Sequence, residues 1–325
     1  MKPKQFNCAL TDADQVAGCG GKAAQLARLL RAGFPVPPGF VVTSAALTDF
    51  LEHNGLAQSA HEFSRRLKSG AEDELFATAD DLRQRVLAGE LPVHLREALD
   101  HWRTRLCPAA TLIVRSSALG EDGAFASFAG QLNSILDVEK LDSALRACWA
   151  SYWSRRVLLY QRSRGVCLEG MGVIVQEQVL PIFAGVMFTA APHSAGGAPE
   201  DLLVEYCSGH GEALVQGRVD PGRVVISRGD FSPQHLARLD DDESPIPEFF
   251  HELARTGLAV EALFGRPQDI EWAQDAQNRL WLVQSRPITT NCPRNSVHER
   301  VQLSLIHISE PTRLRRISYA VFCLK

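Results

Sequence analysis

The 325-residue sequence has no long apolar run, no close pair of cysteines and no large excess of charge of either sign. Its longest apolar stretches, such as 112–114 and 202–204, are far shorter than the ~20 residues that cross a bilayer. The N-terminal segment also lacks the apolar core and the small-residue cleavage site of a signal peptide. We therefore expect a cytoplasmic protein with no membrane partner.

The spacing of the cysteines argues against zinc and redox sites, and the charge argues against nucleic-acid binding. The eight cysteines are scattered through the chain, whereas zinc sites and redox motifs use closely spaced pairs. We expect reduced thiols with mainly structural roles. The net charge is −4 and the sequence has no basic patch, so nucleic acid is not an expected partner.

Hydrophobic periodicity predicts an α+β fold. A helix is expected over 18–32, opened by glycines and stopped by Gly33, and further helices over 45–105, 140–163 and 246–264. Strands are expected at 40–43, 111–117, 172–179, 185–190, 202–206 and 224–228, and a hairpin at 269–275 and 279–287. The runs 172–179 and 185–190 are predicted to be adjacent strands.

The first candidate for chemistry is Gly20-Gly21-Lys22, at the start of the first helix. Glycines before a helix let backbone N–H groups approach an anion, and the helix N-terminus carries about half a positive charge. A lysine there can add a mobile charge for a phosphate. A plain capping turn with a solvated lysine has the same pattern, so this motif alone is weak evidence for a phosphate site.

The second candidate is VRSSALGEDGAFASFAGQ at 114–131. Arg115 ends a buried strand, where a guanidinium is costly unless it meets an anion or a carboxylate. The small and hydroxyl residues that follow allow a backbone that closes over a ligand. The alternative is a surface loop with a structural Arg–Asp pair.

The third candidate is the hairpin DIEWAQD and RLWLVQSRP. Asp269 and Glu271 are two residues apart and therefore share one face of their strand, as do Gln284 and Arg286 on the next. Carboxylates together with phosphate oxygens are the usual surroundings of Mg²⁺. An exposed face of salt bridges is the alternative.

Five motifs in order carry a family resemblance. They are GGKAAQLARLLRAGFPVPPGFVVT, VRSSALGEDGAFASFAGQ, GVIVQEQVLPIFAGVMFTAAP, GHGEALVQGRVDPGRVVISR and DIEWAQD with LWLVQSRPIT. Together they resemble the N-terminal nucleotide-binding domain of phosphoenolpyruvate synthases, pyruvate phosphate dikinases and rifamycin phosphotransferases, over nearly all of 16–290. The resemblance implies an ATP-grasp fold, with ATP and Mg²⁺ held between two lobes at 1–195 and 196–290.

The resemblance also implies roles for individual residues. Those that match phosphate-contacting positions are Lys22, Arg115 and Arg286, and the loop 116–131, which includes Ser116 and Ser117, resembles the flap over the triphosphate. Those that match the adenine and ribose segment are Gln176, Glu177 and Val179. Glu271 and Gln284 match positions that hold metal and phosphate, and Asp269 is a second candidate for the metal. Gly209, Gly211 and Glu212 resemble a glycine-rich G-x-G-E segment, in which His210 is read as tolerated variation.

The family passes phosphate from ATP to a histidine on a separate swivelling domain, which then delivers it to an acceptor such as pyruvate. No such histidine motif is expected in this chain, since His298 lacks Gly/Thr-rich surroundings. Residues 291–302 are predicted to begin a linker. Residues 303–325 contain LSLIHISEPTR and ISYAVFCL, which resemble a translated sequencing adapter, so this segment is predicted to be non-native and the chain truncated.

Three functions remain open from the sequence. The first is the ATP-binding, phosphoryl-donating domain of a phosphoenolpyruvate synthase-like pyruvate, water dikinase. The second is the nucleotide domain of a rifamycin-type antibiotic phosphotransferase, which differs in its acceptor. The third is a non-catalytic nucleotide-sensing module, against which the intact charges of Lys22, Arg115, Glu271 and Arg286 argue.

Overall fold

The computed structural model describes residues 5–120, 132, 134–190, 201–209, 221–237 and 249–288. Several predictions from the sequence lie outside these residues: the loop at 121–131, His210, Gly211, Glu212, His298 and the whole of 291–325. None of the helices in the described part of the chain is long and apolar enough to cross a membrane.

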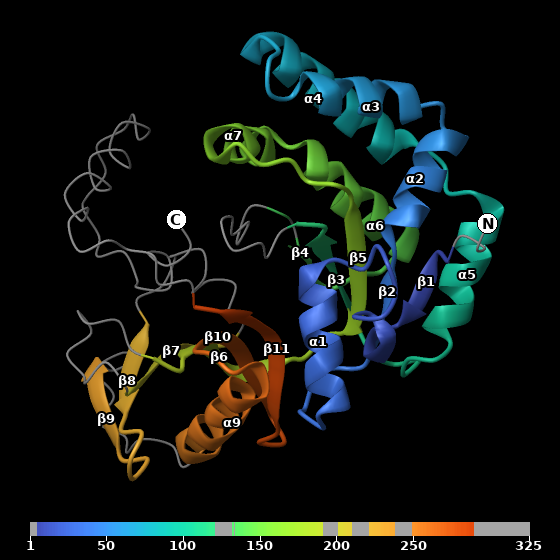
Figure 1. Ribbon diagram of the computed structural model, residues 1–325. Helices are drawn as coiled ribbons and strands as arrows, with labels where there is room; N and C mark the ends of the chain where they lie inside the picture. The colour runs from blue at the N-terminus through green and yellow to red at the C-terminus, as the bar shows by residue number, and fades with distance from the viewer. Residues whose placement is uncertain are drawn as a thin grey trace.

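The first sheet has five antiparallel strands in the order β1-β2-β5-β3-β4 (Figure 1). These strands are β1 (Asn7–Ala9), β2 (Gly39–Val42), β3 (Leu112–Ala118), β4 (Ser134–Ile135) and β5 (Met171–Glu177). One face packs on helices α2 (Ser44–His53), α3 (Ala57–Arg66), α4 (Glu72–Ala88), α5 (Val93–Arg103), α6 (Leu141–Ala150) and α7 (Arg155–Arg164) and the short turn η2 (Ser151–Trp153).

The second sheet has six antiparallel strands in the order β11-β10-β6-β7-β8-β9. They are β6 (Pro181–Phe188), β7 (Leu202–Ser208), β8 (Gly222–Ile226), β9 (Pro233–Ala237), β10 (Gln268–Asp275) and β11 (Leu280–Pro287). Helix α9 (Phe249–Phe264) buries Phe250, Leu253 and Val260 against one face of this sheet.

Helix α1 (Gly21–Arg31) joins the two halves, and Figure 1 shows it between the first sheet and β11. Its buried residues, Ala23, Leu26, Ala27 and Leu29, follow helical spacing. They share one apolar cluster with Val41 and Ile174 of the first sheet, with Leu282 of β11 and with α9. The turn η1 (Leu10–Asp12) packs beside α1. The two sheets are therefore held together by a common apolar core.

Turn residues set the ends of several elements. Gly20 and Gly33 flank α1 with φ of 81° and 83°, values that glycine adopts without steric cost. Ser154 caps α7 by accepting a hydrogen bond from the Val157 N–H at 3.3 Å, and Gly165 ends this helix with φ of 65°. The hairpin between β10 and β11 turns at Asn278, whose φ is 60°.

The predicted α+β class is confirmed, and two antiparallel sheets joined by α1 agree with the expected ATP-grasp arrangement. The predicted adjacency of 172–179 and 185–190 is wrong, because β5 and β6 lie in different sheets. Residues 178–180, Gln-Val-Leu, lack the Gly, Asn or Asp that a short hairpin needs, so the chain runs on into the second sheet. The chain passes from the first sheet to the second between Glu177 and Pro181, whereas the first lobe was predicted to end at residue 195. The division into lobes itself stays a prediction.

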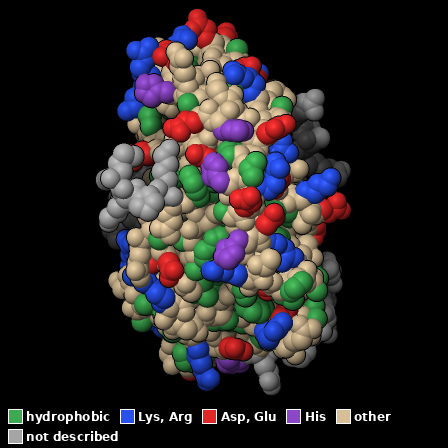
Figure 2. Space-filling view, turned by 90° about the vertical axis from the view of Figure 1, so that its right-hand side faces the viewer, with side chains coloured by type: hydrophobic (Ala, Val, Ile, Leu, Met, Phe, Trp, Pro, Cys, Tyr) green, Lys and Arg blue, Asp and Glu red, His purple; other side chains and the backbone are tan. Residues whose placement is uncertain are grey.

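The side of the molecule on which β1, α2 and α5 lie has a mixed surface. Figure 2 shows Lys and Arg side chains interspersed with Asp and Glu over the described part of this face, rather than gathered by sign. A mixed surface of this kind offers no large single-sign field to steer a charged macromolecule.

Candidate functional site

The first turn of α1 is docked on the end of β3. The backbone N–H of Ala23 donates to Ser117 Oγ at 3.1 Å. A Cβ atom on Gly20 would lie 2.0 Å from the carbonyl oxygen of Ser117, so only glycine permits this approach. The docking brings Lys22, the second residue of α1, to the strand that carries Arg115.

Arg115 crosses from the first sheet to the second. Its Nη2 donates to Gln284 Oε1 at 2.9 Å, and its Nη1 donates to the carbonyl of Val283. The same Nη2 lies 3.5 Å from Glu271 Oε2. Arg115 is only 9% exposed, so these oxygens supply the compensation that a buried guanidinium requires.

A second ion pair lies beside this group on the hairpin. Arg286 donates through Nε to Asp269 Oδ2 at 2.7 Å, and its Nη2 lies 2.6 Å from the same oxygen. The strand register pairs Asp269 with Arg286 and Glu271 with Gln284, which confirms that these residues share one face of the hairpin. The three charged side chains with Gln284 therefore form one continuous polar surface next to Arg115.

Asp269 is the most deeply buried acid of this surface. It is 5% exposed, and its Oδ1 has no hydrogen-bond partner in the described part of the chain. Burial raises the pKa of the Asp269 carboxyl above its ordinary range; Arg286 opposes this shift, whereas Glu271 adds to it. A buried oxygen without a partner is a polar atom that a ligand group or a water molecule can satisfy.

The polar row continues across the second sheet through residues that were not singled out in the sequence. Glu271 pairs with Val186, Val186 with Glu205, and Glu205 with Arg223. Side chains directly opposite one another in antiparallel strands share a face, so Glu205 and Arg223 lie on the same face as Glu271. Arg223 Nε donates to Glu205 Oε1 at 2.8 Å, and the Glu205 side chain has no exposed surface.

The sequence did contain a signal for Glu205: it is one acid within the apolar strand LLVEY. A small apolar cluster flanks this row on the same face of the sheet; its buried members are Val186, Phe188, Leu203 and Val225. The face of the second sheet opposite α9 therefore carries both charged side chains and a small apolar cluster.

The remaining predicted residues lie elsewhere. Strand alternation places Ser116 on the face of Val114 and Ala118, which belong to the core beneath α2–α7. The Gln176 side chain donates to the carbonyl of Pro37 at 2.9 Å, and Glu177 Oε1 accepts from the backbone N–H of Cys107 at 2.7 Å.

Val179 lies on the connection between the sheets and is half-buried. In the part of the chain that the structure describes, no hydrogen bond or ion pair joins Gln176, Glu177 or Val179 to the Arg115 group. The structure thus brings together Arg115, Glu271, Gln284, Asp269 and Arg286, with Ser117 and Lys22 at the adjoining helix terminus.

Comparison with known proteins gives the family. The profile "Pyruvate phosphate dikinase, AMP/ATP-binding domain" matches residues 16–240 and 232–305. A rifampicin phosphotransferase from a Streptomyces species is 35% identical over 326 residues, covering 91% of this chain and 37% of that protein. The phosphoenolpyruvate synthase of Aeropyrum pernix is 32% identical over 335 residues, covering 83% of this chain and 40% of that protein.

Among solved structures, the D-alanine-D-alanine ligase from Coxiella burnetii has 10% sequence identity and a TM-score of 0.33, over 85% of this chain and 49% of that chain. The chain spans 37% and 40% of the length of the two relatives described above. The family profile covers well over half of the chain. The chain therefore belongs to the pyruvate phosphate dikinase AMP/ATP-binding domain family.

Proposed function

We propose that this chain binds ATP together with Mg²⁺ between its two sheets, in the manner of an ATP-grasp protein, and donates a phosphoryl group. The single observation that carries this proposal is the position of Arg115. Its guanidinium leaves the first sheet and meets the oxygens of Gln284 and Glu271 on the second. A cation and hard oxygen donors therefore meet where the two sheets approach each other.

The charged residues suit a triphosphate. Lys22 supplies a cation in the first turn of α1, where backbone N–H groups and the helix dipole also favour phosphate oxygens. Arg115 and Arg286 supply planar guanidinium groups, which bind phosphate oxygens through two parallel hydrogen bonds. Asp269 holds Arg286 in place through Oδ2. Positioning and charge stabilisation account for most of the catalysis in phosphoryl transfer.

The donors at the hairpin fit Mg²⁺. Glu271 offers a carboxylate that is partly exposed, and Gln284 offers an amide oxygen in the next strand. Asp269 is a second candidate: its Oδ2 is committed to Arg286, whereas its buried Oδ1 has no hydrogen-bond partner among the described residues. We assign Glu271 and Gln284 as the residues that would hold the ion. When bound, Mg²⁺ neutralises charge on the phosphate oxygens.

The connection between β5 and β6 suits the base of the nucleotide. Leu180 and Ile182 are 63% and 41% exposed, which is unusual for large apolar side chains in this structure. They follow Gln176, Glu177 and Val179, the residues proposed to line the adenine and ribose. An exposed apolar surface is suited to the face of a planar base.

For the whole protein we propose a cytoplasmic, phosphoenolpyruvate synthase-like dikinase that passes phosphate to a histidine on a further domain. The Aeropyrum relative carries the name of such an enzyme, and the Streptomyces relative supports an antibiotic phosphotransferase as the alternative. The similarity to the two relatives is nearly equal and therefore favours neither acceptor. A nucleotide sensor is a third proposal, which the clustered charges around the site do not favour.

Calorimetric titration of the chain with ATP, with Mg²⁺ and with EDTA, tests the proposed site. We expect saturable binding that is strengthened by Mg²⁺ and weakened by about 1–3 kcal/mol in each of Lys22→Ala and Arg286→Ala, the range of a hydrogen bond to a charged group. Arg65→Ala is the matched control, because Arg65 pairs with Glu62 on the exposed surface of α3. Unchanged affinity in both site variants would contradict the assignment.

A further inference from the structure

Two cysteines that are far apart in sequence meet beside the proposed phosphate site. Cys8 of β1 and Cys19 of the loop before α1 have their Sγ atoms 3.4 Å apart. The two residues are only 2% and 1% exposed. The interval of eleven residues is unlike the close spacing of a redox motif, and it is the return of the chain through η1 to α1 that brings the thiols together.

The contact polarises the pair. Either sulfur could be the donor in this contact, and the hydrogen bond with Cys19 lowers the pKa of Cys8. The same hydrogen bond, together with burial, raises the pKa of Cys19. Since the thiolate is the nucleophilic form of cysteine, Cys8 is the sulfur assigned to attack an oxidant, and Cys19, 3.4 Å away, is the thiol placed to resolve the product.

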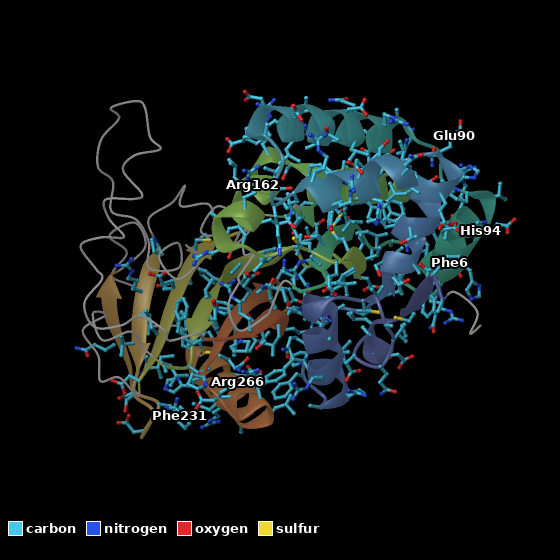
Figure 3. The ribbon with its side chains drawn as sticks, turned by 45° about the horizontal axis from the view of Figure 1, so that its top comes forward. Phe6, Glu90, His94, Arg162, Phe231 and Arg266 are labelled. Carbon is cyan, nitrogen blue, oxygen red and sulfur yellow. The ribbon has the colours of Figure 1, made fainter. Side chains whose placement is uncertain are left out.

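The position of β1 gives a small oxidant a way in. This strand has three residues and lies at the edge of its sheet, where it pairs with β2. Phe6, just before it, packs against His94 of α5 with the ring centroids 5.3 Å apart, and Figure 3 shows both residues at the rim of the molecule. Short edge strands open locally at low free-energy cost.

Cys19 is tied to the nucleotide site by close packing. It lies three residues before Lys22, between Gly18 and Gly20, whose φ angles are 85° and 81°. A Cβ atom on Gly172 of β5 would lie 2.6 Å from the carbonyl oxygen of Cys19, so the loop rests directly on that strand. A disulfide requires sulfurs about 2.05 Å apart. Bringing Cys19 to this distance from Cys8 would therefore shift a loop that is already closely packed on β5.

We propose that Cys8 and Cys19 are an oxidation site, at which hydrogen peroxide forms an intramolecular disulfide that weakens nucleotide binding. The Cys8 thiolate attacks one peroxide oxygen, which gives a sulfenic acid and hydroxide. The Cys19 thiol then attacks the Cys8 sulfur, the S–S bond forms, and the sulfenic oxygen leaves as water with the Cys19 proton. Peroxide is reduced and the two thiols are oxidised by two electrons. The effect on binding rests on the proposed function, whereas the formation of the disulfide does not.

The test uses the chain with Cys107 and Cys167, the exposed thiols among the described residues, replaced by serine, so that they do not compete for oxidant. Peroxide treatment followed by peptide mass mapping should find the Cys8 and Cys19 peptides joined, with a mass lower by two hydrogen atoms. In Cys19→Ser, dimedone should instead trap a sulfenic acid on Cys8. In Cys8→Ser no adduct should form on Cys19. Dithiothreitol should restore both thiols.

Calorimetry on the oxidised and the reduced forms then measures the link to the site. We expect oxidation to weaken ATP binding by about tenfold, the scale of one charge-assisted hydrogen bond, and dithiothreitol to restore it. Cys8→Ser should bind ATP as the reduced chain does and be insensitive to peroxide. Failure to find the joined peptides, or a disulfide that leaves ATP affinity unchanged, would overturn the proposal. If the reduced chain bound no ATP, the proposed function would fail while the peptide map still decided the oxidation chemistry.

Discussion

Arg115 of β3 and Gln284 of β11 are joined by a hydrogen bond of 2.9 Å between Nη2 and Oε1, although they belong to different sheets. The same guanidinium lies near Glu271 and bonds to the carbonyl of Val283. In this arrangement Arg115 occupies the oxygens that we assign to Mg²⁺. Binding of Mg²⁺ with ATP therefore requires the guanidinium to exchange these protein oxygens for phosphate oxygens.

This exchange predicts different results for two substitutions of Arg115. Arg115→Lys keeps the charge but loses the planar fork, and Arg115→Ala loses both. We expect ATP affinity to fall in both, by about 1–3 kcal/mol in Arg115→Ala and by less in Arg115→Lys. Isothermal titration in the presence of Mg²⁺ measures the difference. Equal affinity in wild type and Arg115→Ala would place the triphosphate elsewhere.

Glu271→Gln and Asp269→Asn separate a metal ligand from a positioning residue. Glu271→Gln should weaken ATP binding in Mg²⁺ and leave it nearly unchanged in EDTA, because the substitution removes a metal ligand. Asp269→Asn should weaken binding under both conditions, because it releases Arg286 from the ion pair at Oδ2. Titrations with and without EDTA provide the comparison. If only Asp269→Asn lost ATP affinity, and only in Mg²⁺, Asp269 rather than Glu271 would be the metal ligand.

The hairpin was the part of the site that the sequence predicted best. Alternation along a strand is set by backbone geometry, so two acids at i and i+2 share a face whatever the tertiary fold. The prediction that Asp269 and Glu271 face the same way as Gln284 and Arg286 needed only the correct turn. The structure confirms that pairing residue by residue.

Contacts between distant segments were beyond the sequence. Nothing local to Val114-Arg115-Ser116 shows that the guanidinium reaches β11, because the packing of α1 between the sheets brings the two strands together. The separation of β5 and β6 into different sheets was missed because a strand pattern specifies faces but not partners, although residues 178–180 lack the turn residues of a short hairpin. Glu205 and Arg223 were missed because each was judged within its own strand, whereas the strand register aligns them with Glu271.

Asp275 at the hairpin turn gives a prediction of pH dependence. Its carboxylate accepts hydrogen bonds from the backbone N–H groups of Gln277 and Arg279, from Arg279 Nε at 2.8 Å and from Trp281 Nε1 at 2.9 Å. Burial alone would raise the pKa of Asp275, but these hydrogen bonds together hold it below its ordinary value. A carboxyl with a lowered folded-state pKa stabilises the fold above its unfolded pKa of about 3.9.

This stabilisation should be lost as the pH falls through the lower, folded-state pKa. We expect Asp275→Asn to reduce the free energy of unfolding near neutral pH by about 1–3 kcal/mol, since a charged acceptor of several hydrogen bonds is replaced. The difference between wild type and variant should shrink as the pH falls below about 4. Urea unfolding at a series of pH values measures both curves, with Asp100→Asn on the exposed surface of α5 as the control. A difference independent of pH would exclude a role for the ionised carboxylate.

Gly20 and Gly33, at opposite ends of α1, differ in what an added side chain would meet. Their φ angles are 81° and 83°, so alanine is strained at both positions, and at Gly20 the ψ of 167° lies in a region that essentially only glycine adopts. At Gly33 an added Cβ meets no atom within 4 Å, whereas at Gly20 it would lie 2.0 Å from the Ser117 carbonyl oxygen. We expect Gly33→Ala to lower stability by about 1 kcal/mol and to leave ATP affinity intact. Gly20→Ala should cost more stability and also weaken ATP binding, because the first turn of α1 must leave β3 and take Lys22 with it. Thermal unfolding and ATP titration of the two variants test this, and equal behaviour would show that the docking on Ser117 does not position Lys22.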